Sequence, residues 1–529
     1  MLRRLAICFA FATCCFLNTW VEFAEGENVY FARYDPFRVV ALPVLAWQIF
    51  IVLGMWGSWE FIRRCGRSKA NGIDAVFLSA CVVPLGITAV AVVRLLPFDV
   101  ARVVRSRLFW PVILVLAAAP LRFVMLRPAA ASRWMRSILL YAVPVLVWIF
   151  IQGARATLLR YPRGAYADGP FAVSYPRMPR LRVVWIVFDE LSQSVAFDSR
   201  PTDLKLPNFD RLKNESFYTT GAHAPAGFTE SSLPALVLGE RITAATPQGP
   251  SSLLLATESQ PNARPWNSIP NVFDAARARN LNTAVVGWYH PYGRLLNRSL
   301  TQSYWTAGWL SSGVEEPSES QTLIAGMWFR ARMQLITLPL LGRVPGMSPW
   351  IYRREEQIQR FSYLLDRARQ VVADPLVGLA LIHLPAPHPP AIYSRVRQTL
   401  TSESGHSYLD GVALADRTLG ILRNAVRRAG LEDRTAILVS SDHGWRPYLW
   451  RPTAEWTDED ETVSHRDTSG IPFLLKLPAQ TAARRYDRPF NTVVTKQIIL
   501  SILDGRVQQP DSIADLIEVA ASSFPVSGR

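Results

Sequence analysis

The first part of the chain is a succession of long apolar segments, whereas the remainder alternates short apolar runs with polar and amphipathic stretches. Each long segment is near the ~20 residues that a helix needs to cross a bilayer. A secretory signal peptide is the alternative for the first segment, but it lacks a clear small-residue cleavage site and four more segments follow. We expect five membrane-spanning helices, over Leu5–Ala24, Val39–Trp59, Ala75–Val93, Leu108–Met125 and Ile138–Ala154.

These segments predict a transmembrane helical domain over residues 1–155, followed by a Pro-, Gly-, Tyr- and Arg-rich linker over residues 156–180. Basic residues are somewhat more numerous in the loops on the N-terminal side, which indicates a cytoplasmic N-terminus. Five spans from that start place the rest of the chain outside. We therefore expect a multi-pass protein of the bacterial inner membrane with a periplasmic (extracytoplasmic) catalytic domain.

The second part of the chain shows apolar, β-rich runs that end abruptly in polar residues. Such runs are typical of buried parallel strands, and the segments between them have helical periodicity. The strands expected are Leu181–Phe188, Thr283–Val286, Val377–His383, Ala436–Val439 and Ile471–Leu477. The alternation predicts an α/β domain over residues 181–506, with a mostly parallel central sheet and helices on both faces, and a tail over residues 507–529.

Acidic residues and a histidine follow two of these strands directly. Asp189 and Glu190 follow the first strand, and Asp442 and His443 follow the run that ends at Val439. Chemistry in open α/β sheets collects at the carboxyl ends of strands, and carboxylate with imidazole suits a divalent metal. The alternatives are a helix-capping Asp189 and a plain turn at Asp442.

Hydroxyl residues gather before a helix-like run that starts at Leu233, with Pro234 in its first turn. Thr229 and Ser232 are the candidates there. A hydroxyl at a helix N-terminus lies where the backbone N–H groups favour negative charge, so it can serve as a nucleophile. Simple capping by Ser or Thr is the alternative.

Further candidates lie in loops at the same predicted edge. His383 and His388 belong to a Pro-stiffened loop that suits contact with phosphate or metal, although histidines in such loops are often structural. Tyr292 and Arg294 belong to an aromatic loop, where they would either bind a polar or anionic substrate group or pack as a turn. His465 precedes the last strand and lies in a loop that could reach this edge.

Charge and residue composition indicate which class of partner the protein binds and which part of the chain carries the chemistry. The formal charge is +15, almost entirely from arginine, and with membrane segments present an anionic bilayer is a better partner than nucleic acid, for which no motif exists. All five cysteines lie before residue 82, and all seven histidines lie after residue 220. The second part therefore has no disulfide or thiolate metal site, and it carries the chemistry.

The order of these motifs resembles the alkaline phosphatase/sulfatase superfamily across roughly residues 181–480. The pattern is a strand and acid, T-E-S-S-L-P at a helix start, a His/Pro loop, a strand ending in S-D-H-G, and a later histidine. With the apolar segments in front, the chain looks like the membrane-anchored phosphoethanolamine and phosphoglycerol transferases.

This resemblance implies one divalent metal, zinc or manganese, with a second metal left open. Its ligands would be Asp189 or Glu190, of which we favour Asp189, together with Thr229, Asp442 and His443. Thr229 would be the nucleophile. His388 and His465 would contact the transferred phosphate and protonate the leaving group, and Arg294 would match an arginine that binds phosphoglycerol.

The chain also departs from the family pattern. It has no cysteine in this domain, His-Pro-Pro replaces His-Gly-Pro at His388, and Leu236 stands where the sulfatase signature has arginine. The last departure argues against a formylglycine sulfatase and leaves Ser232 as a rival nucleophile.

We therefore expect transfer of a phospho-alcohol headgroup from a phospholipid donor to an envelope lipid or glycan through a phospho-threonine. A membrane-anchored sulfatase-like hydrolase or phosphodiesterase is one alternative. A non-catalytic membrane-anchored binding protein is the other.

Overall fold

A computed structural model describes residues 1–24, 29–64, 70–94, 122–307, 322–336 and 349–521. The contacts within the chain divide it into two compact units. The first comprises Met1–Gly164 together with Leu310–Pro349, and the second comprises Ala165–Trp309 together with Trp350–Arg529. The predicted linker thus spans the division at Gly164, while an internal segment of the predicted catalytic domain belongs to the first unit.

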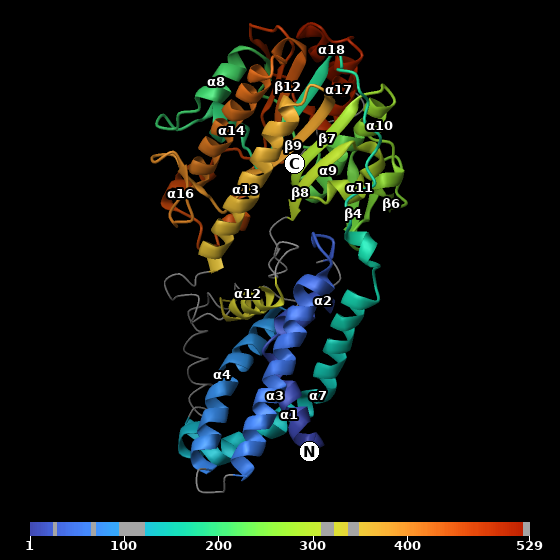
Figure 1. The fold of residues 1–529 in the computed structure, drawn as a ribbon. Coiled ribbons are helices and arrows are strands. Elements are labelled where there is room, and N and C mark those ends of the chain that lie inside the picture. The colour runs from blue at the N-terminus through green and yellow to red at the C-terminus, as the bar shows by residue number, and fades with distance from the viewer. Residues whose placement is uncertain (25–28, 65–69, 95–121, 308–321, 337–348, 522–529) are drawn as a thin grey trace. The chain divides into compact units, whose positions relative to one another are not determined.

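The first unit is helical (Figure 1). Its described elements are α1 (Leu2–Cys14), α2 (Leu17–Ala24), the π-helical turn η2 (Phe37–Ala41), α3 (Leu42–Arg64), α4 (Ala70–Arg94), α7 (Pro128–Leu158) and α12 (Leu323–Ile336). Two helices are long and apolar enough to cross a membrane, over Phe37–Arg64 and Pro128–Ala156. They correspond to the second and fifth predicted spans.

The other predicted spans have different outcomes. The first is broken into α1 and α2, each shorter than a bilayer crossing. The third forms α4, whose apolar part is the shorter stretch Asp74–Ala89. Most of the fourth lies outside the described residues. The described residues thus support two candidate spans rather than five.

The second unit is built on an eight-stranded sheet with the order β14-β2-β13-β12-β1-β9-β7-β8. The strands are β1 (Arg182–Asp189), β2 (Phe217–Thr219), β7 (Asn282–Tyr289), β8 (Gln302–Ala307), β9 (Val377–Pro387), β12 (Thr435–Ser441), β13 (Phe473–Lys476) and β14 (Arg484–Tyr486). The five strands from β12 to β8 pair in parallel, and β13 joins β12 antiparallel. The predicted mostly parallel sheet is confirmed.

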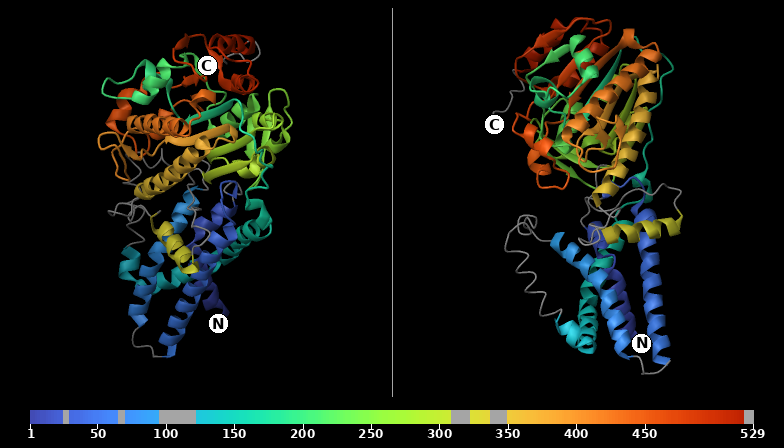
Figure 2. Two further views of the ribbon diagram at one scale, coloured as in Figure 1. Left: turned by 45° about the horizontal axis from the view of Figure 1, so that its top comes forward. Right: turned by 90° about the vertical axis from the view of Figure 1, so that its left-hand side faces the viewer.

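Helices cover both faces of this sheet (Figures 1 and 2). On one face, α8 (Pro207–Asn214), α13 (Pro349–Ala373) and α14 (Tyr408–Arg428) bury a core with Val184, Ile186 and Ile382 of the central strands. On the other face lie α9 (Thr229–Leu238), α10 (Val272–Arg277) and α17 (Thr495–Leu503). The central strands are buried throughout because both faces are covered, and they therefore read as continuous apolar runs.

Smaller elements complete the second unit. They are β3 (Ala222–His223), β4 (Ile242–Pro247), β5 (Leu253–Thr257), β6 (Arg264–Pro265), β10 (Tyr393–Ser394), β11 (Thr399–Leu400), β15 (Phe490–Asn491), α11 (Tyr292–Leu295), α15 (Pro447–Trp450), α16 (Asp458–Ser464) and α18 (Asp511–Ala521). Helix α18 falls within the predicted C-terminal tail.

Candidate active site

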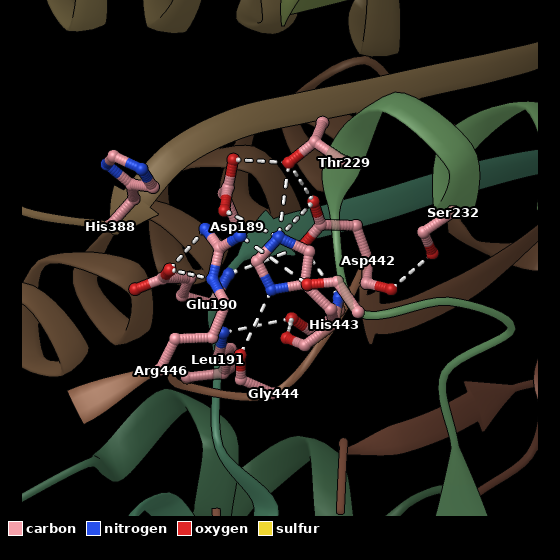
Figure 3. A network of polar contacts seen from close by, with 12 residues as sticks. Asp189, Glu190, Leu191, Thr229, Ser232, His388, Asp442, His443, Gly444 and Arg446 are labelled. Atoms are coloured by element: carbon pink, nitrogen blue, oxygen red, sulfur yellow. Dashed lines mark hydrogen bonds and ion pairs between the residues drawn. The ribbon is translucent and has the colours of Figure 1, made fainter. Parts of the chain in front are cut away.

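The carboxyl ends of β1 and β12 and the N-terminus of α9 bring Asp189, Thr229, Asp442 and His443 together (Figure 3). Strands β1 and β12 are parallel neighbours, with Phe188 opposite Ser441. Their next residues, Asp189 and Asp442, therefore leave the sheet side by side. All four side chains are buried.

The consecutive acids Asp189 and Glu190 point in different directions and contact different residues. The pairing of β1 with β9 shifts between Phe188 and Asp189, and Glu190 has a positive φ of 64°. This kink directs Asp189 toward Thr229, whereas Glu190 accepts hydrogen bonds from Arg446 Nε at 2.6 Å and Trp450 Nε1 at 2.9 Å. The geometry therefore places Asp189, rather than Glu190, beside the hydroxyl of Thr229.

Thr229 is the hydroxyl at the centre of the cluster. Its Oγ1 donates to Asp442 Oδ2 at 2.8 Å and lies 3.4 Å from Asp189 Oδ2 and 3.2 Å from His443 Nε2. The hydroxyl of Ser232 instead donates to the main-chain oxygen of Asp442. Ser232 therefore supports the strand end, and Thr229 is the hydroxyl that faces the carboxylates.

Two histidines present their Nε2 atoms to these carboxylates. Nδ1 of His443 lies 3.0 Å from the carbonyl oxygen of Gly444, and Nδ1 of His383 lies 3.2 Å from that of Trp288. A carbonyl only accepts, so each Nδ1 carries a proton and each Nε2 is the ring atom that faces the carboxylates. Nε2 of His383 then lies 3.8 Å from Asp189 Oδ2 and 3.9 Å from Asp442 Oδ2.

The cluster carries more negative charge than its protein partners balance. Burial, together with Asp442 and Glu190, raises the pKa of Asp189 well above its usual range. Burial opposes ionisation of Asp442 too, but His443 and His383 outweigh it and lower the pKa of that carboxyl. Of the charged side chains that contact these three acids, only Arg446 is a guanidinium, and it pairs with Glu190, so the carboxylate of Asp442 lacks an arginine or lysine partner within the described residues.

This arrangement fits a divalent metal. Within the described part of the chain, Asp189 Oδ1 and His383 Nε2 are buried without a hydrogen-bond partner, although both face the cluster. Carboxylate oxygens and imidazole Nε2 atoms converge in two overlapping groups, Asp189–Glu190–His443 and Asp189–His383–Asp442. A cation with O and N ligands would satisfy these atoms and neutralise the carboxylates. His383, for which the sequence suggested contact with either phosphate or metal, belongs to this donor set.

His388 lies beside the cluster in an aromatic niche. Its main-chain N–H donates to the carbonyl oxygen of Asp189 at 3.1 Å, and its ring contacts the rings of Trp288 and Trp450 at centroid distances of 5.0 and 4.9 Å. Burial lowers the pKa of His388 to about 4, and Nδ1 donates to the carbonyl oxygen of Pro389. At neutral pH its Nε2 is therefore unprotonated.

The remaining predicted site residues lie outside the cluster. The hydroxyl of Tyr292 is 3.1 Å from His383 Nδ1, so it orients that ring. Arg294 is buried over the ring of Trp305, and its Nε lies 3.8 Å from Asp168 Oδ1. His465 lies at the end of α16, exposed and 3.4 Å from Glu461. Substrate binding by Tyr292 and Arg294 and acid catalysis by His465 stay predictions.

Sequence reasoning missed two residues at this site. Nε2 of His290 lies 3.2 Å from the carbonyl oxygen of Thr229 and positions the start of α9. Arg446 covers the ring of Phe228 and borders a hollow that His443, His223 and Tyr448 also line. Arg446 stands three residues after His443 in S-D-H-G-W-R, and that proximity was the only available signal.

The buried rings of His290 and His383 and the half-buried ring of His388 should make stability fall in acid. Burial lowers the pKa of His290 to about 3 and those of His383 and His388 to about 4. Between about pH 6.5 and 4 these histidines are protonated in the unfolded chain but not in the folded chain. Each histidine therefore lowers the free energy of unfolding by up to about 1.4 kcal/mol for every pH unit by which the pH falls. Asp189 has the opposite effect on stability, because its raised pKa lets the folded chain bind one proton that the unfolded chain does not bind.

Thermal unfolding of the chelator-treated full chain in detergent, measured from pH 7 to pH 4.5, tests this expectation. The unfolding midpoint should fall over that range, and His290→Gln should reduce the slope. A flat profile in the unmodified chain would contradict the burial of these rings in neutral form.

Comparison with known proteins identifies the family to which this chain belongs. Residues 182–504 match the family model described as Sulfatase. No curated protein matches the chain. Among solved structures, the lipoteichoic acid synthase LtaP from Listeria monocytogenes is similar at 13% identity, with 63% of this chain and 75% of that chain covered and a TM-score of 0.36.

Two further solved structures are similar at the same low level. A phosphonate monoester hydrolase of Agrobacterium radiobacter has 14% identity, with 61% of this chain and 74% of that chain covered and a TM-score of 0.39. A protein in the alkaline phosphatase superfamily from Vibrio parahaemolyticus has 14% identity, with 62% and 68% covered and a TM-score of 0.36. The family assignment rests on the match over residues 182–504.

Proposed function

Because the chain belongs to the sulfatase family, we propose that it is a metal-dependent transferase that moves a phospho-alcohol headgroup from a phospholipid to an envelope lipid or glycan. The observation that carries this proposal is the position of Thr229, whose Oγ1 lies within 3.4 Å of Asp189, Asp442 and His443. A threonine cannot be converted to formylglycine, so it supports direct attack on phosphorus rather than sulfatase chemistry.

The metal-binding residues in this proposal are Asp189, Asp442, His443 and Thr229, with His383 as a further ligand. The metal is zinc or manganese. When bound, it would lower the pKa of the Thr229 hydroxyl and offset the charge of the phosphoryl oxygens. Glu190 stays outside this set because Arg446 and Trp450 already bind both of its oxygens.

The reaction proceeds in two half-reactions that balance. Thr229 Oγ1 forms a bond to phosphorus, the bond from phosphorus to the donor oxygen breaks, and the leaving alcohol takes up one proton as Thr229 loses one. The acceptor hydroxyl then attacks the phospho-threonine, gives up its proton, and Thr229 regains a proton. The N-terminus of α9 favours the negative charge that develops near Thr229.

We assign the proton transfer of the second half-reaction to His388. Its neutral Nε2 can accept the proton of the acceptor hydroxyl, and its main chain lies against Asp189. We expect His388→Gln to lower turnover by about 10²–10⁴-fold, which is typical of general acid–base groups. His465→Gln should lower turnover less than His388→Gln, because His465 is exposed and lies outside the cluster.

Steady-state turnover of both variants on the same lipid donor and acceptor checks this assignment. The loss in His388→Gln should be smaller when a strong nucleophile such as hydroxylamine replaces the acceptor, because that nucleophile needs less base assistance. If instead His465→Gln loses activity and His388→Gln retains it, the roles are reversed.

Intact-mass measurement tests the function itself. The full chain in detergent is incubated with zinc or manganese and a mixed phospholipid extract, without acceptor. We expect a mass increase equal to one phospho-alcohol headgroup on the peptide that contains Thr229. An adduct on Ser232 would overturn the assignment of the nucleophile, and the mass of the adduct would identify the headgroup.

A hydrolase is the second candidate, and one observation favours it. The hollow lined by His443, Arg446 and Tyr448 is open, so water can reach the edge of the site. Product analysis with and without a lipid or glycan acceptor separates the two activities. Release of the free headgroup phosphate at an equal rate in both samples would identify a hydrolase.

A further inference from the structure

Helix α12 has the reverse of the polarity that a helix on a water-soluble surface shows. Gly326, Arg330 and Gln334 recur every four residues and are buried, whereas Ile324 and Trp328 are 67% and 66% exposed, with the exposed Arg332 one turn further toward the C-terminal end of the helix. In a globular protein the apolar stripe of a helix packs inward and the polar face meets water. An exposed apolar face with a buried polar one indicates an apolar solvent.

The buried side of α12 packs on other helices of the first unit. Gln334 Nε2 donates to Thr19 Oγ1 of α2 at 2.9 Å, and Trp47 Nε1 of α3 donates to the carbonyl oxygen of Met327 at 2.5 Å. A Cβ at Gly326 would lie 3.0 Å from Pro43 Cγ, so glycine permits close approach to α3. Small residues and interhelical hydrogen bonds are typical of helix packing in membranes.

The exposed side of α12 is continuous with the exposed apolar face of α3. The rings of Trp328 and Trp47 contact each other at 5.8 Å, and Trp47 contacts Phe50 at 5.6 Å. Phe50 is 64% exposed, and Leu53, one turn further along α3, is also exposed. Because α3 lies in a candidate membrane span, whatever covers its outer face also covers Trp328.

We propose that α12 is a membrane-embedded helix that lies in the plane of a phospholipid bilayer, near the boundary between headgroups and acyl chains. It runs across α3 rather than along it, close to the N-terminal end of α3 (Figures 1 and 2). Tryptophan is enriched at this depth. The proposal rests on the membrane-bound enzyme described under Proposed function and adds a second membrane contact to it.

This contact bears on the substrate because of where α12 sits in the chain. It is inserted between β8, which ends at Ala307, and β9, which begins at Val377, and both strands belong to the catalytic sheet. The catalytic sheet is therefore connected to the bilayer through its own strand connection as well as through the N-terminal helices. Such an attachment suits an ester that is itself anchored in the membrane.

Photolabelling of the full chain in nanodiscs tests this proposal. The nanodiscs contain phosphatidylethanolamine and phosphatidylglycerol with a trace of phospholipid that carries a diazirine on its acyl chain. We expect lipid adducts on residues 323–328 and on residues 49–53 of α3, and none around Val396, an exposed residue of the catalytic unit. Labelling does not require turnover, so an inactive protein would not affect the result.

A substitution completes the test. Trp328→Glu should lower labelling of residues 323–328 by about threefold or more, because a carboxylate is costly within hydrocarbon, while Val396→Glu should not change it. Labelling of α3 without any labelling of α12 would overturn the proposal. Crosslinking of Trp328 to a second chain, with no lipid adduct, would also overturn it and identify a protein as the occupant.

Discussion

Thr229→Ala is expected to lower turnover by at least about 10⁴-fold and to leave no headgroup adduct on the protein, because removal of a covalent nucleophile costs several orders of magnitude. The side chain is buried at the point where Asp189, Asp442 and His443 converge, so water is a poor substitute for its oxygen. Turnover on a phospholipid donor and intact mass after incubation are the two measurements.

Two variants control for this result. Thr229→Ser keeps an oxygen at the same position, so it should form the adduct and keep turnover within about 100-fold. Ser232→Ala removes only a hydrogen bond to the main-chain oxygen of Asp442, so it should lose about tenfold or less. Full activity in Thr229→Ala would rule out a phospho-threonine.

The second large effect concerns the metal. Zinc or manganese should raise the thermal unfolding midpoint of the chelator-treated chain. A ligand whose free concentration is 100 times its Kd stabilises the folded state by about 2.7 kcal/mol. Asp189→Asn should abolish most of this increase. The same variant should unfold at a higher temperature than the unmodified chain when both are metal-free, because it removes one of two adjacent buried carboxylates.

Glu190→Gln is the matched control for this prediction. Glu190 is adjacent in sequence and equally buried, but its oxygens bind Arg446 and Trp450. It should lower the stability of the metal-free chain and keep the stabilisation by metal. If Glu190→Gln loses the response to metal and Asp189→Asn retains it, Glu190 is the ligand.

Much of the catalytic unit could be predicted from the sequence because its central strands are buried on both faces. Continuous apolar runs located β1, β9 and β12, and the residues that follow β1 and β12 formed the cluster. The choice between Asp189 and Glu190 could not be derived from the pattern, since it depends on the positive φ at Glu190. A local kink of this kind leaves no periodic signal.

Other features depend on contacts between distant segments. His290 reaches the carbonyl of Thr229 across 61 positions, and no local pattern marks it as part of the site. The contact of the Arg294 guanidinium with the ring of Trp305 is also invisible to a local pattern, and substrate binding by Arg294 stays a prediction. Hydropathy also does not predict the break between α1 and α2, because both helices are apolar and only Cys15 and Phe16 separate them.

The insertion of α12 has a practical consequence for obtaining the catalytic unit alone. A fragment that starts after Gly164 would still contain residues 310–349, and Ile324 and Trp328 would remain exposed while Gly326, Arg330 and Gln334 would lose their packing against α2 and α3. Such a fragment should aggregate or require detergent. A short Gly/Ser bridge in place of residues 310–348 should yield a monodisperse domain. A single protease cut in the linker would not release the catalytic unit from the membrane, because α12 would still attach it.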